Sequence, residues 1–152
     1  MKLTSEQRAF LEQQHSAAMV TLRRDGTPHV ARVGVAMVDG RLWSSGVPSR
    51  VRTSHLRRDP RCTLFVFDAQ RFWVGLETTV TIHAGPDAAD MNLRLFTEMQ
   101  KGLGLPPGTL VWYGQPKTEP EFLQAMRDEQ RLIYEFAEPT RVYGLLTVPT
   151  SL

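Results

Sequence analysis

The sequence contains a single cysteine, Cys62, in 152 residues. One cysteine excludes a disulfide bond within the chain and any metal site built from several thiolates, and this usage is typical of a reducing compartment. Cys62 opens an apolar run, so we expect a buried thiol and not a nucleophile.

Long apolar runs are also absent. No run approaches the ~20 residues that a membrane-spanning helix needs. The first residues, Met1–Glu6, lack the apolar core of a secretory signal. We therefore expect a cytoplasmic protein with no membrane partner.

Neither a dominant charge nor a metal-binding pattern is present. Lys and Arg number 18 against 16 Asp and Glu, so the net charge is only +2 and nucleic-acid binding is not favoured. Residues 102–104, Gly-Leu-Gly, do not follow a strand as the loop of a dinucleotide-binding fold would. No HxH or HxxxH spacing occurs, so no metal site is expected. The histidines concerned are His15, His29, His55 and His83.

The composition is that of an ordinary globular protein. Hydrophobic residues make up 41% of the chain and charged residues 22%. A chain of this length buries about 68–70% of the surface that it exposes when unfolded. We therefore expect one domain over residues 1–152, with a true core and no internal linker.

Basic charge is concentrated in one stretch, residues 50–61. Residues 41–45 are predicted to be a strand and residues 46–48 a loop. Ser49 would then cap a short helix that ends at Asp59-Pro60, because proline lacks the backbone donor and disfavours a helical residue before it. The five arginines are Arg50, Arg52, Arg57, Arg58 and Arg61.

This strand, loop and helix predict an anion site. Arg50 and Arg52 lie in the first helical turn, where free N–H groups and the positive end of the helix dipole favour negative charge. Arginine also pairs with phosphate oxygens through two donors at once. Neutral donors would come from the hydroxyls of Ser44, Ser45 and Ser49. The alternative is a solvated basic helix face.

Alternating apolar residues and tight turns predict a mostly antiparallel β structure. Turns are expected at Asp25-Gly26 and Asp39-Gly40. The first three strands would form a meander, and the whole set would curl into a sheet or barrel. The expected strands span residues 17–22, 28–37, 41–45, 62–68, 71–84, 131–136 and 141–146.

Three further segments are expected to be helical. The first spans residues 4–14, where Thr4 and Gln7 have capping-box spacing. The others span residues 90–101 and 119–129, separated by an irregular loop rich in glycine and proline. Their apolar residues are expected to pack in the core or at a dimer contact. These residues are Met91, Leu95, Phe96, Met99, Phe122, Leu123 and Met126.

Three motifs carry a resemblance to a known family. They are Asp25-Gly26-Thr27-Pro28-His29-Val30, Arg50-Val51-Arg52 leading into Leu56-Arg57-Arg58-Asp59-Pro60-Arg61, and Arg141-Val142-Tyr143-Gly144. Over roughly residues 5–148, the sequence resembles the pyridoxamine 5'-phosphate oxidase-like split β-barrels, and most of all the flavin/deazaflavin oxidoreductases that use coenzyme F420. The resemblance implies a mainly β fold, an antiparallel split β-barrel of six to seven strands with flanking helices.

The basic motif departs from the family pattern at two positions. The family commonly has a lysine where this chain has Arg52, and an amide side chain where it has His55. Both exchanges keep hydrogen-bond donors. Arginine is bulkier and presents a planar fork, so it holds a phosphate in a different geometry from lysine.

The resemblance also implies a homodimer whose cofactor lies in a groove where the two subunits meet. By position, the phosphate would be held by Arg50, Arg52, Ser49 and His55, beside a loop lined by Ser45 and Gly46. The ring system would lie over Arg32, Val33 and Gly34 and be walled by Trp73 and His29.

The implied function is hydride transfer from reduced F420 to an unsaturated organic acceptor, such as a tetrapyrrole, a quinone or an enone. F420 carries a phosphodiester and a glutamate tail, so a basic groove is complementary to it. The cofactor itself carries the hydride, so no catalytic side chain is assigned. Two alternatives stay open: an FMN-dependent oxidoreductase of the same fold, and a non-catalytic module that binds a flavin, a haem or a fatty acid.

Overall fold

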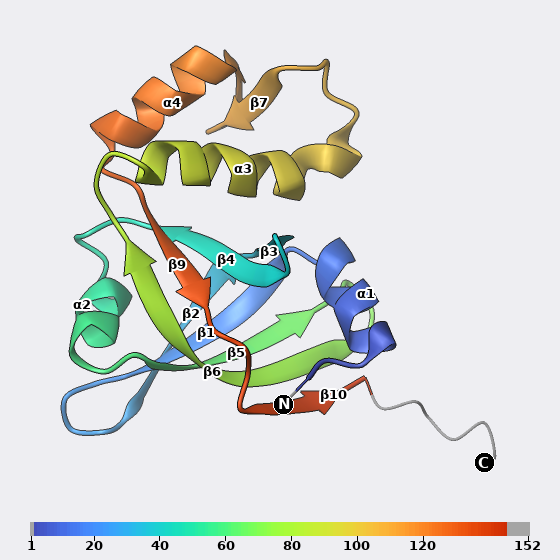
Figure 1. Ribbon diagram of the computed structural model, residues 1–152, viewed down its shortest axis with the longest axis vertical. Coiled ribbons are helices and arrows are strands. Elements are labelled where there is room, and N and C mark those ends of the chain that lie inside the picture. Colours follow the sequence, from blue (N-terminus) through green and yellow to red (C-terminus); the bar gives the residue numbers. More distant parts are fainter. Residues whose placement is uncertain (1, 146–152) are drawn as a thin grey trace.

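The fold is built on one curled antiparallel sheet, shown in Figure 1 for the computed structural model, which describes residues 2–145. Within those residues the sheet has eight strands, in the order β2-β1-β5-β6-β9-β4-β3, with β10 pairing with β6 beside this path. The predicted mainly β, antiparallel split-barrel fold is confirmed. The strands are β1 Ser16–Leu22, β2 Pro28–Gly34, β3 Ala36–Val38, β4 Arg41–Gly46, β5 Arg61–Phe67, β6 Trp73–His83, β9 Leu132–Phe136 and β10 Arg141–Gly144. The expected end of the last strand, Leu146, lies outside the described residues.

The helices lie around this sheet. In Figure 1, α1 and α2 flank the barrel on opposite sides, and α3 and α4 form a layer over one end of it. The capping box of α1 is confirmed, because the Thr4 hydroxyl accepts from the Gln7 N–H and the Gln7 side chain accepts from the Thr4 N–H. The helices are α1 Ser5–Gln13, α2 Val51–Arg58, α3 Ala88–Gln100 and α4 Glu119–Asp128, with a 3-10 turn at Lys101–Leu103.

The predicted strand over residues 28–37 is two strands, and this correction explains the higher strand count. β2 pairs with β1, whereas β3 pairs with β4, so the chain passes from one half of the sheet to the other at Val35. The Val35 N–H donates to the His15 carbonyl, and its own carbonyl lies 2.9 Å from His15 Nδ1. Alternation of apolar residues continues through Val35, so the break left no mark in the sequence pattern.

A second correction concerns the start of α2. Ser49 was expected to cap this helix, but the N-cap is Arg50, and no side chain bonds to the first turn. The loop is closed by backbone contacts, because the Arg50 N–H donates to the Val47 carbonyl and the Thr53 N–H donates to the Arg50 carbonyl. The predicted end is confirmed, since Asp59 is the C-cap.

The segment between α3 and α4 is more regular than predicted. It contains a hairpin of β7 (Thr109–Trp112) and β8 (Gln115–Thr118). Tyr113 and Gly114 both have positive φ, at 49° and 75°, as a two-residue hairpin turn of type I′ requires. The glycines and prolines of this segment predicted an irregular loop, and the turn gave no signal because a tyrosine rarely occupies that conformation.

The core follows the alternation of the strands. In β1, for example, Ala17, Met19 and Thr21 are buried and their neighbours are half-exposed. Cys62 is buried, as predicted, and burial raises the pKa of its thiol to about 12. Leu95 of α3 is fully buried against Trp43 and other residues of the sheet, which confirms the apolar stripe predicted for that helix.

No helix within residues 2–145 is both long and apolar enough to cross a membrane.

Candidate functional site

The candidate site lies where β4 ends and α2 begins. Arg50 is exposed at the helix start, and Arg52, two residues further along in the first turn, is half-exposed. The Arg52 guanidinium carbon lies 6.0 Å from the centroid of the Tyr134 ring. Its Nε atom is buried and has no hydrogen-bond partner within the described residues. A buried donor without a partner is costly, so an acceptor that reached this nitrogen would stabilise it.

Tyr134 fixes the loop that carries these arginines. It comes from β9, is fully buried, and shares a hydrogen bond with the Thr53 hydroxyl. Because that hydroxyl donates to the Val47 carbonyl over 2.8 Å, Tyr134 is the donor to Thr53. A Cβ at Gly46 would lie 2.3 Å from the Tyr134 hydroxyl oxygen, so the close approach requires glycine. The network therefore holds the loop and the start of α2 in one position.

A pair of histidines lies on the side of α2 that faces β1. His55 is buried, and its Nδ1 lies 2.9 Å from the Thr21 hydroxyl. The ring of His29, on β2, meets the His55 ring edge-on at a centroid distance of 5.3 Å. Burial, followed by the proximity of His29, lowers the pKa of His55, and a lowered pKa favours the neutral imidazole. His29 Nδ1 is the second buried nitrogen without a partner in the described part of the chain.

The serines of the predicted site have different environments. Ser45 donates to the Asn92 side chain over 2.6 Å, which joins β4 to the fully buried Asn92 of α3. Ser44 donates to the Gly34 carbonyl over 2.7 Å. Ser49 is exposed in the loop. The two strand serines thus already have partners, whereas Ser49 faces solvent.

The three predicted ring-binding residues of β2 point in different directions. Arg32 is exposed, and Val33 is buried in the main core. A Cβ at Gly34 would lie 2.5 Å from Met99 Cε, so this position is closely packed. β2 is an end strand of the sheet. A ring beside it would therefore contact backbone groups on its free edge and not the Val33 side chain.

Trp73 is not brought to α2 within one chain. It pairs with Phe67 at the hairpin end of β5 and β6, whereas α2 leads into the opposite end of β5, where Arg61 pairs with Thr79. Trp73 instead stacks on Phe65, with ring centroids 5.1 Å apart. The sequence-based prediction therefore placed Trp73 in one site with α2, although the two lie at opposite ends of the β5–β6 hairpin.

The five arginines of the basic stretch, residues 50–61, differ in their partners. Arg61 pairs with Asp59 over 2.8 Å, and its hydrogen bonds lower the pKa of Asp59 to about 2. Arg58 donates to the Leu22 carbonyl. Within residues 2–145, Arg50, Arg52 and Arg57 form no ion pair. Unpaired positive charge thus remains at the start of the helix, where the helix dipole adds to it.

Sequence reasoning missed Tyr134, Asn92 and Thr21, which position the site. Tyr134 lies in a strand in which every residue except Glu135 is apolar or aromatic, so nothing in the sequence distinguishes it from a core tyrosine. Asn92 is a buried amide in the middle of a helix, where asparagine is unfavourable. That local conflict is the signal that would have identified it.

Comparisons with known proteins agree with this fold. The pyridoxamine 5'-phosphate oxidase family profile matches residues 3–118. Sequence comparison with curated proteins finds no match. Among solved structures, the fold is similar to the conserved hypothetical protein Rv2991 from Mycobacterium tuberculosis, with a TM-score of 0.69, 19% identity, and coverage of 95% of this chain and 84% of that one.

Two further structures share the fold. One is described as an F420 reductase, with a TM-score of 0.65, 17% identity, and coverage of 93% of this chain and 98% of that one. The other is HutZ, a haem storage protein from Vibrio cholerae, with a TM-score of 0.64, 10% identity, and 95% coverage of both chains. At these identities the likeness shows the fold alone. The family match over most of the sequence goes further: the chain belongs to the pyridoxamine 5'-phosphate oxidase family.

Proposed function

We propose that this protein is an oxidoreductase that binds coenzyme F420 beside α2 and passes hydride from the reduced cofactor to an unsaturated organic acceptor. The acceptor classes are a tetrapyrrole, a quinone or an enone. The observation that carries the proposal is the buried, unpartnered Nε of Arg52, next to the exposed Arg50 at the start of the helix.

The residues present fit the anionic part of such a cofactor. A phosphate oxygen at the start of α2 would satisfy Arg52 Nε and accept from the first helical N–H groups, which no side chain caps. Arg50 would add a second fork of donors, and Ser49 an exposed hydroxyl. The unpartnered His29 Nδ1 offers a further polar contact on the β2 side.

The protein's part in the reaction is positioning. When bound, F420 supplies the hydride chemistry itself. The loop between β4 and α2 is held rigid by Tyr134, Thr53 and Gly46. The ring of F420 would therefore be placed against the free edge of β2 without reorganisation of this loop. Neutral His55 stabilises the base of α2 through Thr21 and adds no positive charge at neutral pH.

FMN is the alternative cofactor, because its phosphate would suit the same arginines. Arg57 on the same helix favours the deazaflavin, since it is exposed and forms no ion pair in the described part of the chain. FMN carries one phosphate, whereas F420 adds a carboxylate-bearing tail that needs further cations. Arg57 is a cation that a single phosphate at Arg50 and Arg52 would leave unused.

The proposal includes a homodimer that completes the groove. In Figure 1, no helix lies over the side of β5, β6 and β10 that faces away from α3 and α4. Phe65, Trp73 and Tyr143 of these three strands form an aromatic cluster. The exposed fractions are 39% for Phe65, 36% for Trp73 and 40% for Tyr143, and Val30 nearby reaches 64%. Apolar surface of this kind, gathered on one face, favours a partner. A second copy on this face would bring Trp73 toward the other subunit's cofactor.

The test is turnover. The purified protein would be mixed with reduced F420 and, in separate reactions, with menadione, biliverdin and 2-cyclohexen-1-one, and oxidation of the cofactor would be followed by absorbance. Acceptor-dependent oxidation that is lost in the Arg52→Glu variant supports the proposal. Tight binding of F420 without turnover of any acceptor would support the non-catalytic module instead, and turnover with reduced FMN alone would move the protein to the FMN-dependent class.

A further inference from the structure

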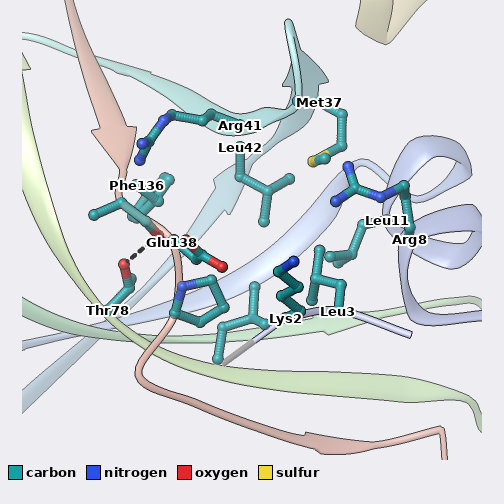
Figure 2. A pocket seen from close by; sticks show the side chains of 14 residues that line it. Lys2, Leu3, Arg8, Leu11, Met37, Arg41, Leu42, Thr78, Phe136 and Glu138 are labelled. Carbon is teal, nitrogen blue, oxygen red and sulfur yellow. Dashed lines mark hydrogen bonds between the residues drawn. The ribbon is translucent and has the colours of Figure 1, made fainter. Parts of the chain in front are cut away.

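A cavity lies at the other side of the barrel, away from α2. It has a volume of about 420 Å³ and is bounded by α1, the turn between β3 and β4, and the segment between β9 and β10. Figure 2 shows its lining side chains. Its floor is apolar and is formed by buried residues of four elements: Leu11, Leu42, Leu76 and Phe136.

The rim of this cavity is basic. Lys2, Arg8 and Arg41 come from three separate segments and surround the floor in Figure 2. All three are exposed, and none forms an ion pair with another residue in the range 2–145. Among the described residues, Glu138 is the one acidic residue that lines the cavity. Three cations around one opening repel one another unless an anion lies between them.

We propose that this cavity binds a small amphipathic anion, a molecule with an apolar body and one acidic group. The body would occupy the floor of Leu11, Leu42, Leu76 and Phe136, and the acidic group would lie at the rim between Arg8 and Arg41. The volume is in the range of small-molecule sites, about 300–1,000 Å³, which are mostly apolar with a few polar groups that fix orientation.

The cavity is preformed. Leu11 anchors α1 in the core, and the Gln7 side chain donates to the Gly144 carbonyl over 3.4 Å. The capping box at Thr4 fixes the first turn of the same helix. On the opposite wall, the Thr78 hydroxyl donates to the Ala137 carbonyl over 2.7 Å. Binding of a ligand would therefore cost little conformational entropy, because the cavity walls are already ordered.

The site is independent of the proposed F420 site. None of its lining residues belongs to α2, to the loop before it, or to β2. Loss of F420 binding should therefore leave anion binding in the cavity unchanged, and the reverse also holds. The two proposals can thus fail separately.

The experiment uses the fluorescent anion 8-anilinonaphthalene-1-sulfonate with the full-length protein. Displacement would be measured with 2-naphthoate and with its neutral counterpart 2-naphthylmethanol. We expect saturable binding of one dye per chain, and displacement by the acid at concentrations at least tenfold lower than by the alcohol. Failure of the wild-type protein to bind the dye in this way, or equal displacement by acid and alcohol, would overturn the proposal.

Charge variants locate the site. Arg8→Glu with Arg41→Glu reverses the rim charge at exposed positions and should weaken binding of dye and 2-naphthoate at least tenfold, with F420 binding unchanged. The matched control is Arg24→Glu with Arg127→Glu, which makes the same charge change at exposed positions outside the cavity lining. Equal affinity in the two double variants would overturn the proposal, because the dye would then respond to net charge or bind elsewhere.

A cavity-filling variant tests the floor. Met37 lines the cavity and is half-buried, so Met37→Trp should occupy part of the volume and weaken dye binding at least fivefold. Its free energy of unfolding would be measured alongside to confirm that it folds. A folded Met37→Trp protein that binds the dye as the wild type does would contradict the assignment.

Discussion

At the scale of single residues, Arg52 gives the clearest evidence for an anion site over a solvated basic helix face. Its Nε is buried without a partner, whereas Arg57 on the same helix is exposed. Evenly exposed arginines would indicate only a solvated face. A buried nitrogen without a partner indicates a position where an acceptor is missing.

We predict that Arg52→Glu weakens F420 binding by about 2–4 kcal/mol, because it removes a charge-assisted pair and adds repulsion. Arg57→Glu makes the same charge change on an exposed side chain of the same helix, which would contact only the carboxylate tail of F420. It should weaken binding less, by under about 1 kcal/mol, because an ion pair of an exposed side chain contributes little. Affinities would be measured by isothermal titration. If Arg57→Glu abolished binding and Arg52→Glu did not, the phosphate would lie elsewhere on α2.

His55 gives a prediction about pH. Its pKa is lowered by burial and by His29, so below the ordinary value of 6.5 the unfolded chain binds the proton more readily than the folded one. The free energy of unfolding should therefore fall as the pH drops below about 6.5. His55→Gln removes the titrating group and should flatten this dependence. Urea unfolding between pH 8 and pH 5.5 would test it, and equal pH dependence in both proteins would contradict the assignment.

At the scale of elements, the strands and turns were predictable because alternation and the Asp-Gly turns act locally. Asp39 and Gly40 have positive φ, at 51° and 80°, as the expected hairpin requires. The break at Val35 was not predictable, because it depends on which half of the sheet each part of the chain joins. The N-cap at Arg50 was missed because the Thr53 and Val47 contact, and not a serine side chain, starts α2.

The candidate site shows the same division. The basic stretch, its strand and loop, and the end of its helix follow from local sequence. The grouping of His29 with His55 depends on how α2 packs beside β2. The grouping of Gly46 with Tyr134 depends on the pairing of the distant strands β4 and β9. Family resemblance proposed His29 and Gly46 but gave no reason for either. The contacts supply the reason for Gly46, which is the space that the Tyr134 ring occupies.

The junction of β4 with β9 gives a prediction at this scale. Gly46→Ala would place a methyl group within 2.3–2.6 Å of the Tyr134 ring and hydroxyl, so it should destabilise the fold by about 1–3 kcal/mol. It should also weaken F420 binding, because the loop before α2 would shift. The control is Gly102→Ala, where a Cβ meets no atom within 4 Å. Equal unfolding free energies in the two variants would show that the junction tolerates a side chain.

At the scale of the whole molecule, the barrel has two distinct sides. α2 and its arginines lie at one, and α1 covers a basic-rimmed cavity at the other (Figure 1, Figure 2). The outer sheet face, with Phe65, Trp73 and Tyr143, lies on the part of the sheet that α3 does not cover. This arrangement leaves an aromatic surface for a second copy without blocking α2 or the cavity.

We predict that the protein is a dimer in solution and that Phe65→Lys with Trp73→Lys makes it monomeric, because two desolvated charges would face the partner. F420 affinity should fall in the same variant if the partner completes the groove. Light scattering gives the mass. The control is Leu103→Lys, an exposed apolar residue outside this face. A monomeric wild type, or a double variant that stays dimeric, would contradict the assignment of this face.

The most direct test of the central claim is a fluorescence titration of the cofactor-stripped protein with F420 and, separately, with FMN, each at low and high salt. The account predicts tight binding of F420 that weakens as salt screens the arginines, with FMN binding at least tenfold more weakly. Preference for FMN would contradict the cofactor assignment and leave the phosphate site in place. Binding of neither molecule would contradict the assignment of α2 as a cofactor site.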